Sequence, residues 1–126
     1  MSMIKLMYLI LGGISGTISR YVLSGVIYRL LGTNFPYGTF IVNILGCLVI
    51  GLLAGFSEKK FLLSEEMRLL LMVGFCGAFT TFSTFIFETD HLVRDGEMIK
   101  ASLNIILSVF VGFILYRLGF FLAELI

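Results

Sequence analysis

Four long apolar runs dominate this sequence of 126 residues and restrict the folds open to it. They cover about residues 4–31, 37–56, 67–92 and 98–125. A helix of about 20 apolar residues suffices to cross the hydrocarbon core of a bilayer. We therefore expect an all-α integral membrane protein, in which residues 1–126 form a single membrane domain with four transmembrane helices.

The composition excludes several classes of function. Hydrophobic residues make up 59% of the chain and charged residues 13%, against about 45–50% and about 25% in soluble domains. A net charge of +1 provides no basic surface for nucleic acid. Cys47 and Cys76 lie inside apolar runs, where they are expected to pack as small apolar residues. His91 is the only histidine, so neither a metal cluster nor a catalytic base is evident and we expect no enzyme.

The connections between the runs carry recognisable helix boundaries. Gly32 and Pro36 separate the first run from the second, and proline is tolerated in the first turn of a helix. Ser64 is expected to cap the third helix, with Glu65 and Glu66 placed favourably against the helix dipole. Both termini then lie on the same side of the membrane.

Positive charges are almost evenly divided between the two ends of the predicted bundle. The side of the termini carries Lys5, Lys59, Lys60 and Arg68, and the other side carries Arg29, Arg94 and Lys100. Lysine and arginine in short loops normally set the orientation of a membrane protein. The balance points to a dual-topology protein that forms an antiparallel homodimer, although a bias this small also arises by chance.

Arg20 is a charged residue well inside the first run. Thirteen Leu, Ile and Val residues of that run favour insertion by roughly 4–8 kcal/mol in total, against a cost of about 3 kcal/mol for one arginine. The side chain either extends to an interface or stays buried, where its guanidinium would orient backbone carbonyls or attract anions. Gly12 and Gly16 share its helix face and would let another helix pack closely.

Polar stripes also mark the second and fourth runs. Every fourth residue is involved, namely Thr39, Asn43 and Cys47 in the second run and Asn104, Ser108, Gly112 and Tyr116 in the fourth. Hydrocarbon cannot satisfy an amide, so Asn43 either bonds to another helix or faces water. Polar stripes on three helices favour a water-lined space. Their hydrogen-bond donors outnumber carboxylates, so such a lining suits an anion.

The third run contains the segment with the clearest functional signal. It starts as a plain apolar helix at residues 69–73, and from Gly74 to Phe85 it reads Gly-Phe-Cys-Gly-Ala-Phe-Thr-Thr-Phe-Ser-Thr-Phe. Glycines and hydroxyl side chains weaken a helix, so we expect a break at mid-membrane depth. Non-helical backbone is tolerated there only inside protein or beside a cavity, and it offers carbonyls and helix ends to ions. Phe79, Phe82 and Phe85 recur every third residue, and the positive edge of a phenyl ring can contact an anion.

Three motifs resemble those of the small bacterial fluoride channels of the Fluc/CrcB family. The third run carries Gly77–Phe85 followed by Glu88, the second carries residues 38–46, and the first carries Gly12 through Gly16 to Arg20. The motifs occur in the family's order, and the resemblance covers essentially the whole chain. Ala78 stands where a glycine is frequent in the family.

The resemblance implies a passive channel that exports fluoride across the plasma (inner) membrane of a bacterium. It also implies an antiparallel homodimer with two fluoride pathways, each lined by both subunits, and a structural sodium ion at the dimer interface. The implied fluoride pathway consists of Asn43, Phe82, Phe85, Ser83, Thr84 and Ser108. Arg20 and Glu88 would support it, and the backbone carbonyls of Gly77 and Thr80 would bind sodium.

Three other functions fit the sequence less well. A dual-topology proton-coupled drug exporter needs a titratable carboxylate in its first helix, where this chain has Arg20. A membrane enzyme would need a credible base or nucleophile, which is absent. A structural subunit of a larger complex would not need the polar stripes.

Overall fold

The computed structural model describes all residues 1–126 and contains helices and short connections without strands. In chain order the helices are α1 (Met3–Leu31), α2 (Tyr37–Glu58), α3 (Glu65–Arg68), η1 (Leu69–Cys76), α4 (Gly77–Phe79), α5 (Phe82–Arg94) and α6 (Met98–Leu125). Four helical spans are long and apolar enough to cross a membrane, with α3 to α5 together forming the third. Four membrane-length helices were expected, and the fold confirms them.

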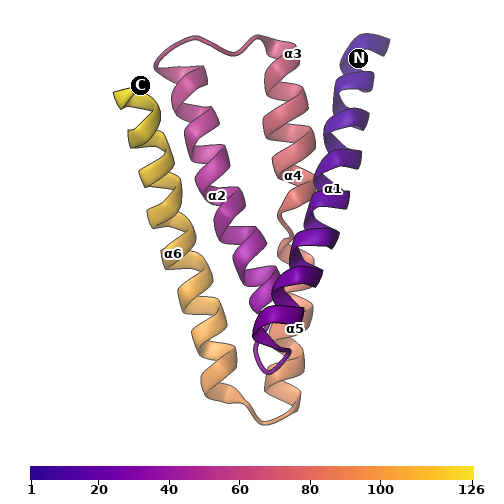
Figure 1. The fold of residues 1–126 in the computed structure, drawn as a ribbon, viewed down its shortest axis with the longest axis vertical. Coiled ribbons are helices and arrows are strands. Elements are labelled where there is room, and N and C mark those ends of the chain that lie inside the picture. The colour runs from indigo at the N-terminus through magenta and orange to yellow at the C-terminus, as the bar shows by residue number, and fades with distance from the viewer.

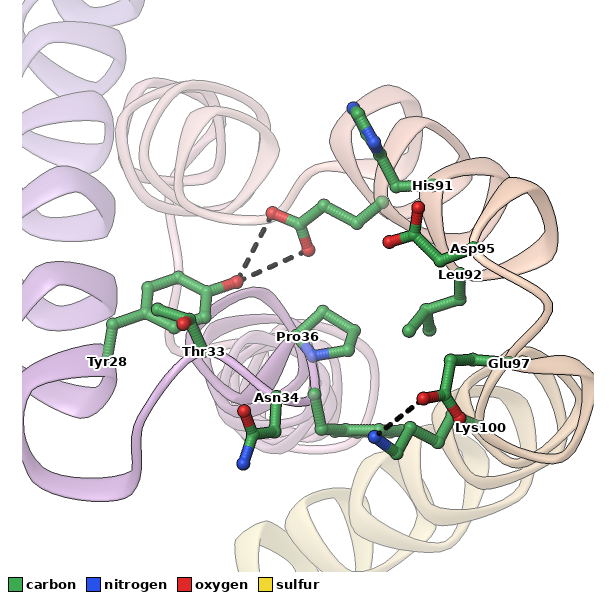
Figure 2. A pocket seen from close by; sticks show the side chains of 11 residues that line it. Tyr28, Thr33, Asn34, Pro36, His91, Leu92, Asp95, Glu97 and Lys100 are labelled. Carbon is green, nitrogen blue, oxygen red and sulfur yellow. Dashed lines mark hydrogen bonds and ion pairs between the residues drawn. The ribbon is translucent and has the colours of Figure 1, made fainter.

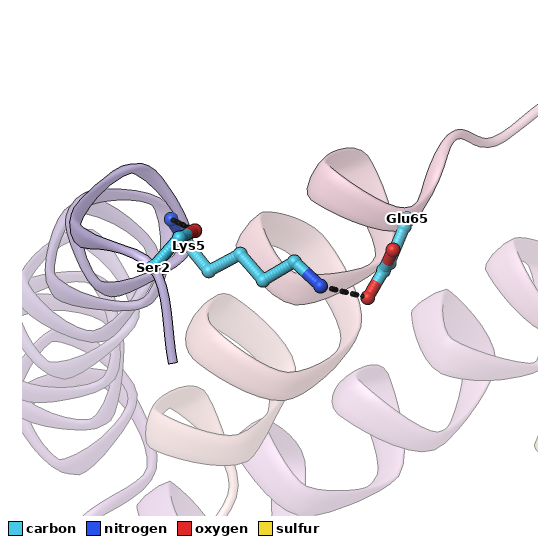
Figure 3. Close-up of polar contacts among 3 residues, drawn as sticks. All are labelled: Ser2, Lys5 and Glu65. Carbon is cyan, nitrogen blue, oxygen red and sulfur yellow. Dashed lines mark hydrogen bonds and ion pairs between the residues drawn. The ribbon is translucent and has the colours of Figure 1, made fainter.

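The N-terminus, the C-terminus and the α2–α3 connection lie at one end of the subunit, and the other two connections lie at the opposite end (Figure 1). Ser64 caps α3 as expected, because its side chain accepts a hydrogen bond from the Met67 N–H. Glu65 in the same turn forms an ion pair with Lys5 of α1 (Figure 3). Both side chains are partly or largely exposed, so the pair ties the two helix ends together but adds little stability.

Helix α1 packs against the third span through glycines. A Cβ on Gly12 would lie 2.9 Å from the Cα of Gly74, and one on Gly16 would lie 3.1 Å from the Cβ of Ala78. Both would also collide with backbone carbonyl oxygens of η1. Since neither glycine has a side chain, the two backbones approach closely, as the spacing of the glycines predicted.

Helix α2 packs along α6 by the same means. A Cβ on Gly51 would meet the backbone of Tyr116, and one on Gly119 would lie 2.8 Å from the backbone nitrogen of Leu52. The subunit therefore consists of two closely packed helix pairs, α1 with the third span and α2 with α6. The pair α2–α6 lies on the left in Figure 1 and the pair α1–third span on the right.

The third span is interrupted at two residues. Helix α4 ends at Phe79 and α5 begins at Phe82, with Thr80 (φ −91°, ψ 157°) and Thr81 (φ −150°, ψ 115°) extended between them. The expected break is thus confirmed and confined to the two adjacent threonines. Residues 69–73 are helical and apolar as expected, but η1 is wound as a π-helix rather than an α-helix. The apolar side chains of this segment suit an α-helix and a π-helix equally, so the sequence does not distinguish the two.

Candidate functional site

Asn43 of α2 is bonded to the broken backbone at Thr81. Its side-chain Nδ2 donates to the Thr81 carbonyl at 3.0 Å, and its Oδ1 accepts from the Thr81 N–H at 2.7 Å. The amide therefore replaces the helical partners that Thr81 lacks, which removes the cost of unpaired backbone groups in the membrane. One hydrogen of Nδ2 is left over for a further acceptor.

Arg20 of α1 contacts the other side of the same break. Its Nε donates to the Ala78 carbonyl oxygen at 2.9 Å, one turn before Thr81. The guanidinium thus holds a backbone carbonyl in the third span, which is one of the two alternatives that the sequence left open for this residue. A positive charge here also complements the dipole of the continuous helical stretch of α3, η1 and α4, which ends at Phe79.

The break itself arranges two more hydroxyl groups. Thr80 Oγ1 donates back to the Cys76 carbonyl at 2.9 Å, in addition to the helical bond that the same carbonyl accepts from the Thr80 N–H at 3.1 Å. Thr81 caps α5, because its Oγ1 accepts from the Thr84 N–H at 3.2 Å and donates to Thr84 Oγ1 at 3.1 Å. Since Thr84 Oγ1 already accepts this bond, its own hydrogen is available to a ligand. Ser83, between Thr84 and Phe82, is exposed on the subunit surface.

Phe82 and Phe85 lie side by side at the start of α5. Their ring centroids are 5.7 Å apart and their planes are tilted by 48°. Phe82 is 75% exposed, whereas Phe85 is only 6% exposed. The structure brings the two predicted rings together, with one of them at the surface of the subunit and the other inside it.

Ser108 of α6 lies beside α5 but reaches it through another residue. Its Oγ donates to Asn104 Oδ1 over 3.5 Å, and Asn104 Nδ2 donates to Thr89 Oγ1 at 2.9 Å. Thr89 Oγ1 in turn donates to the Phe85 carbonyl at 2.7 Å. A chain of hydrogen bonds therefore runs from Ser108 to the backbone of Phe85.

Glu88 of α5 is held by side chains of two other helices. The Tyr28 hydroxyl donates to its carboxylate at 3.2 and 3.3 Å, and Thr39 Oγ1 donates to it at 2.9 Å. Tyr28 and Glu88 line a cavity of about 490 Å³, and Figure 2 shows the Tyr28 hydroxyl directed at this carboxylate. His91 and Asp95 line the same cavity, which lies between the α1–α2 connection and the start of α6.

A second cavity, of about 270 Å³, lies directly beside the break. It is lined by Asn43, Gly46, Cys47, Ile50, Met72, Cys76, Gly77, Thr80, Thr81 and Phe82. Gly77 and Thr80, whose carbonyls were expected to bind sodium, therefore border one space. No group of three His, Cys, Asp or Glu side chains is placed to hold a metal ion. A cation here would depend on backbone oxygens, which are the ligands that hard cations prefer.

The polar stripes are explained by contacts that the sequence only partly suggested. Rather than lining one common space inside the subunit, Arg20, Asn43, Thr39 and Asn104 all bond to the third span. Their partners Tyr28, Thr81 and Thr89 could not be identified from the sequence. Spacing along one helix shows which side chains share a face, but it does not show which helix lies opposite.

The comparison with known proteins covers nearly the whole chain. Residues 7–120 match the family described as "CrcB-like protein, Camphor Resistance (CrcB)". The fluoride-specific ion channel FluC of Nitrosococcus oceani is 42% identical over 122 residues, covering 97% of this chain and 98% of the relative. The FluC proteins of Maridesulfovibrio salexigens and Methylobacillus flagellatus are 45% and 46% identical, each over 97% or more of both chains. The chain belongs to the CrcB family.

Proposed function

We propose that this multi-pass membrane protein is a fluoride-specific ion channel. The observation that carries the proposal is its similarity, over almost its whole length, to relatives that bear this name. Ion channels are not enzymes, and the site offers hydrogen-bond donors and ring edges to an anion. We place the channel in the inner membrane of a bacterium, where it would lower the concentration of fluoride in the cytoplasm.

The proposed pathway runs along the start of α5. Fluoride is small and strongly hydrated, so the protein has to replace its water with several donors. The remaining N–H of Asn43 and the hydroxyls of Ser83, Thr84 and Ser108 supply them, and Phe82 and Phe85 present ring edges to the anion. Arg20 and Glu88 support the pathway by holding the break and the middle of α5.

A second copy of the chain would complete this site. Within one subunit, Phe82 is 75% exposed and Ser83 is exposed beside non-helical backbone. Such backbone is tolerated at membrane depth only where protein or a water-filled cavity covers it, and lipid cannot satisfy it. The open cavity beside the break therefore needs a cover. We propose an antiparallel homodimer with two pathways, consistent with the even division of positive charge between the two ends.

A sodium ion fits the same place in the dimer. Gly77 is exposed, and the Thr81 N–H four residues on, which would bond to its carbonyl in a continuous helix, bonds to Asn43 Oδ1 instead. Thr80 is extended rather than helical. We propose that the carbonyls of Gly77 and Thr80 from both subunits hold the ion, which would neutralise converging carbonyl dipoles at the interface.

Export through such a channel needs no fuel. An interior negative by 100 mV drives a monovalent anion outward with about 2.3 kcal/mol, which corresponds to roughly a fifty-fold gradient. Fluoride enters cells as its neutral acid and is trapped when the acid ionises. A passive exit is therefore sufficient for protection.

Fluoride efflux from liposomes that contain the purified protein tests this function. We expect electrogenic efflux of fluoride, measured with a fluoride electrode and triggered by a potassium ionophore, and no comparable efflux of chloride. Empty liposomes are the control. Efflux of chloride without fluoride, or of neither ion, would refute the proposal.

The two rings are tested by Phe82→Ile and Phe85→Ile. Isoleucine fills part of the space but has no positive edge, so we expect either change to lower fluoride efflux by about tenfold or more, since about 1.4 kcal/mol corresponds to a factor of ten. Phe87→Ile is the matched control, because Phe87 is 60% exposed on the same helix and its ring packs on His91 instead. Dimer content should stay unchanged in gel filtration. Wild-type efflux in both variants would exclude the rings from the pathway.

A further inference from the structure

Helix α5 has few attachments to the rest of the subunit. Phe85 and Thr89 are its only buried residues, and they lie four residues apart on one face. Phe85 is 6% exposed and Thr89 is 7% exposed. Because the helix starts at the break, it is not held in line by continuous helical hydrogen bonds from α4. Besides the bonds of Tyr28 and Thr39 to the Glu88 carboxylate, its orientation depends on the side chains that contact this face.

Asn104 of α6 is the polar side chain that meets this face. It is 1% exposed, and only Asn104 and Val42 rank as large side chains that are fully buried. Its Nδ2 donates to Thr89 Oγ1 at 2.9 Å. The Thr89 hydroxyl in turn donates its own hydrogen to the Phe85 carbonyl at 2.7 Å. An amide buried to this extent is costly unless it is bonded, so its bonds resist any rotation or sliding of α5 against α6.

The same amide holds the hydroxyl of Ser108. Ser108 Oγ donates to Asn104 Oδ1 over 3.5 Å, which is long compared with about 2.7–2.8 Å for a typical hydroxyl bond. A bond this long is weak. The single proton of Ser108 can therefore turn to a passing anion at little cost and return to Asn104 afterwards.

We propose that Asn104 and Thr89 are positioning residues of the ion pathway. Together they fix α5 on α6 so that the ring of Phe85 keeps a constant position relative to Ser108, whose hydroxyl stays free to turn. Neither residue has to touch the ion. The inference rests on the proposed fluoride channel, because it assigns Phe85 and Ser108 to one pathway.

Thr89→Val tests the proposal with little change in shape. Valine keeps the branched side chain but removes both the bond to Asn104 and the bond to the Phe85 carbonyl. We expect fluoride efflux from liposomes to fall by about tenfold, the factor that corresponds to the loss of the one bond, to Asn104, that joins α5 to α6. Thr89→Ser keeps the hydroxyl and should restore efflux to near the wild-type rate. Thr17→Val is the matched control, since Thr17 is exposed on α1.

A second measurement follows the ring itself and does not depend on ion flux. With 4-fluorophenylalanine at position 85, the ¹⁹F resonance should shift or broaden in Thr89→Val and stay unchanged in Thr89→Ser and Thr17→Val. Three results would overturn the inference: an unchanged resonance in Thr89→Val, unchanged efflux despite a shifted resonance, or failure of serine to rescue. If the resonance shifts as expected but the wild-type protein does not conduct fluoride, the positioning stands and the proposed function fails.

Discussion

Arg20 and Asn43 carry polar groups into the membrane, and both direct them at backbone atoms of the third span. The Arg20 Nε bonds to the Ala78 carbonyl, and the Asn43 amide bonds to both backbone groups of Thr81. An unpaired backbone group costs several kcal/mol in lipid. The two side chains therefore stabilise a break that the bilayer alone would not tolerate.

Arg20→Met should destabilise the subunit. The substitution removes a charge-assisted hydrogen bond and leaves the Ala78 carbonyl without this partner, which we expect to cost about 1.5–3 kcal/mol. Equilibrium unfolding in mixed micelles measures the change without including the cost of membrane insertion. Arg29→Met is the control, because Arg29 lies exposed in the last turn of α1. Equal losses in the two variants would mean that the contact with Ala78 adds nothing specific.

At the scale of elements, α1 and the third span form one closely packed pair because of a few glycines. Gly12 and Gly16 face η1, whereas Gly13 between them has no atom within 4 Å of a built Cβ. Closely packed backbones keep Arg20, one turn further along α1, within reach of the break. The packing of this pair is thus a condition for the polar contacts at the site.

Gly16→Ala and Gly13→Ala should have opposite effects on stability. A methyl group at Gly16 would collide with the Phe75 carbonyl, so the helices must separate, at a cost of about 1–3 kcal/mol. At Gly13 the space is open and alanine favours the helix by about 1 kcal/mol. Thermal unfolding of the two variants in detergent compares them directly. Destabilisation by both changes to the same extent would show that helix contact at Gly16 is not limiting.

At the scale of the whole molecule, the face that carries the break is left open. The cavity of about 270 Å³ beside the break reaches Phe82, which is 75% exposed. The outer face of α6 exposes further large side chains, among them Phe110 and Phe113. Lipid suits the phenylalanines of α6 but not the extended backbone at Thr80, and this difference is why we place the second subunit over the break.

Gly77→Leu tests where the second subunit binds. A leucine at this exposed position meets nothing inside its own subunit but would project into the proposed interface. We expect the variant to keep its helical circular dichroism, to run as a monomer in light scattering and to lose fluoride efflux. Gly25→Leu is the control, since Gly25 on α1 is equally unobstructed. A Gly77→Leu dimer with wild-type efflux would place the interface elsewhere.

The sequence by itself determined the four spans and the break in the third of them. Apolar runs of this length have to form membrane helices because lipid leaves backbone groups no other partner. The closely spaced glycine, serine and threonine residues of the third run weaken a continuous helix, and the structure interrupts it at Thr80 and Thr81. These are local properties, so they could be inferred from neighbouring residues.

Only the tertiary structure decided what each polar side chain contacts. Asn43 meets Thr81, 38 residues away, and Tyr28 meets Glu88, 60 residues away. Neither contact can be predicted from residue spacing. Spacing along a helix gives the direction of a side chain but not the helix that packs opposite it. That choice depends on where glycines let backbones approach and how far each helix tilts. The whole packed subunit therefore sets these partners.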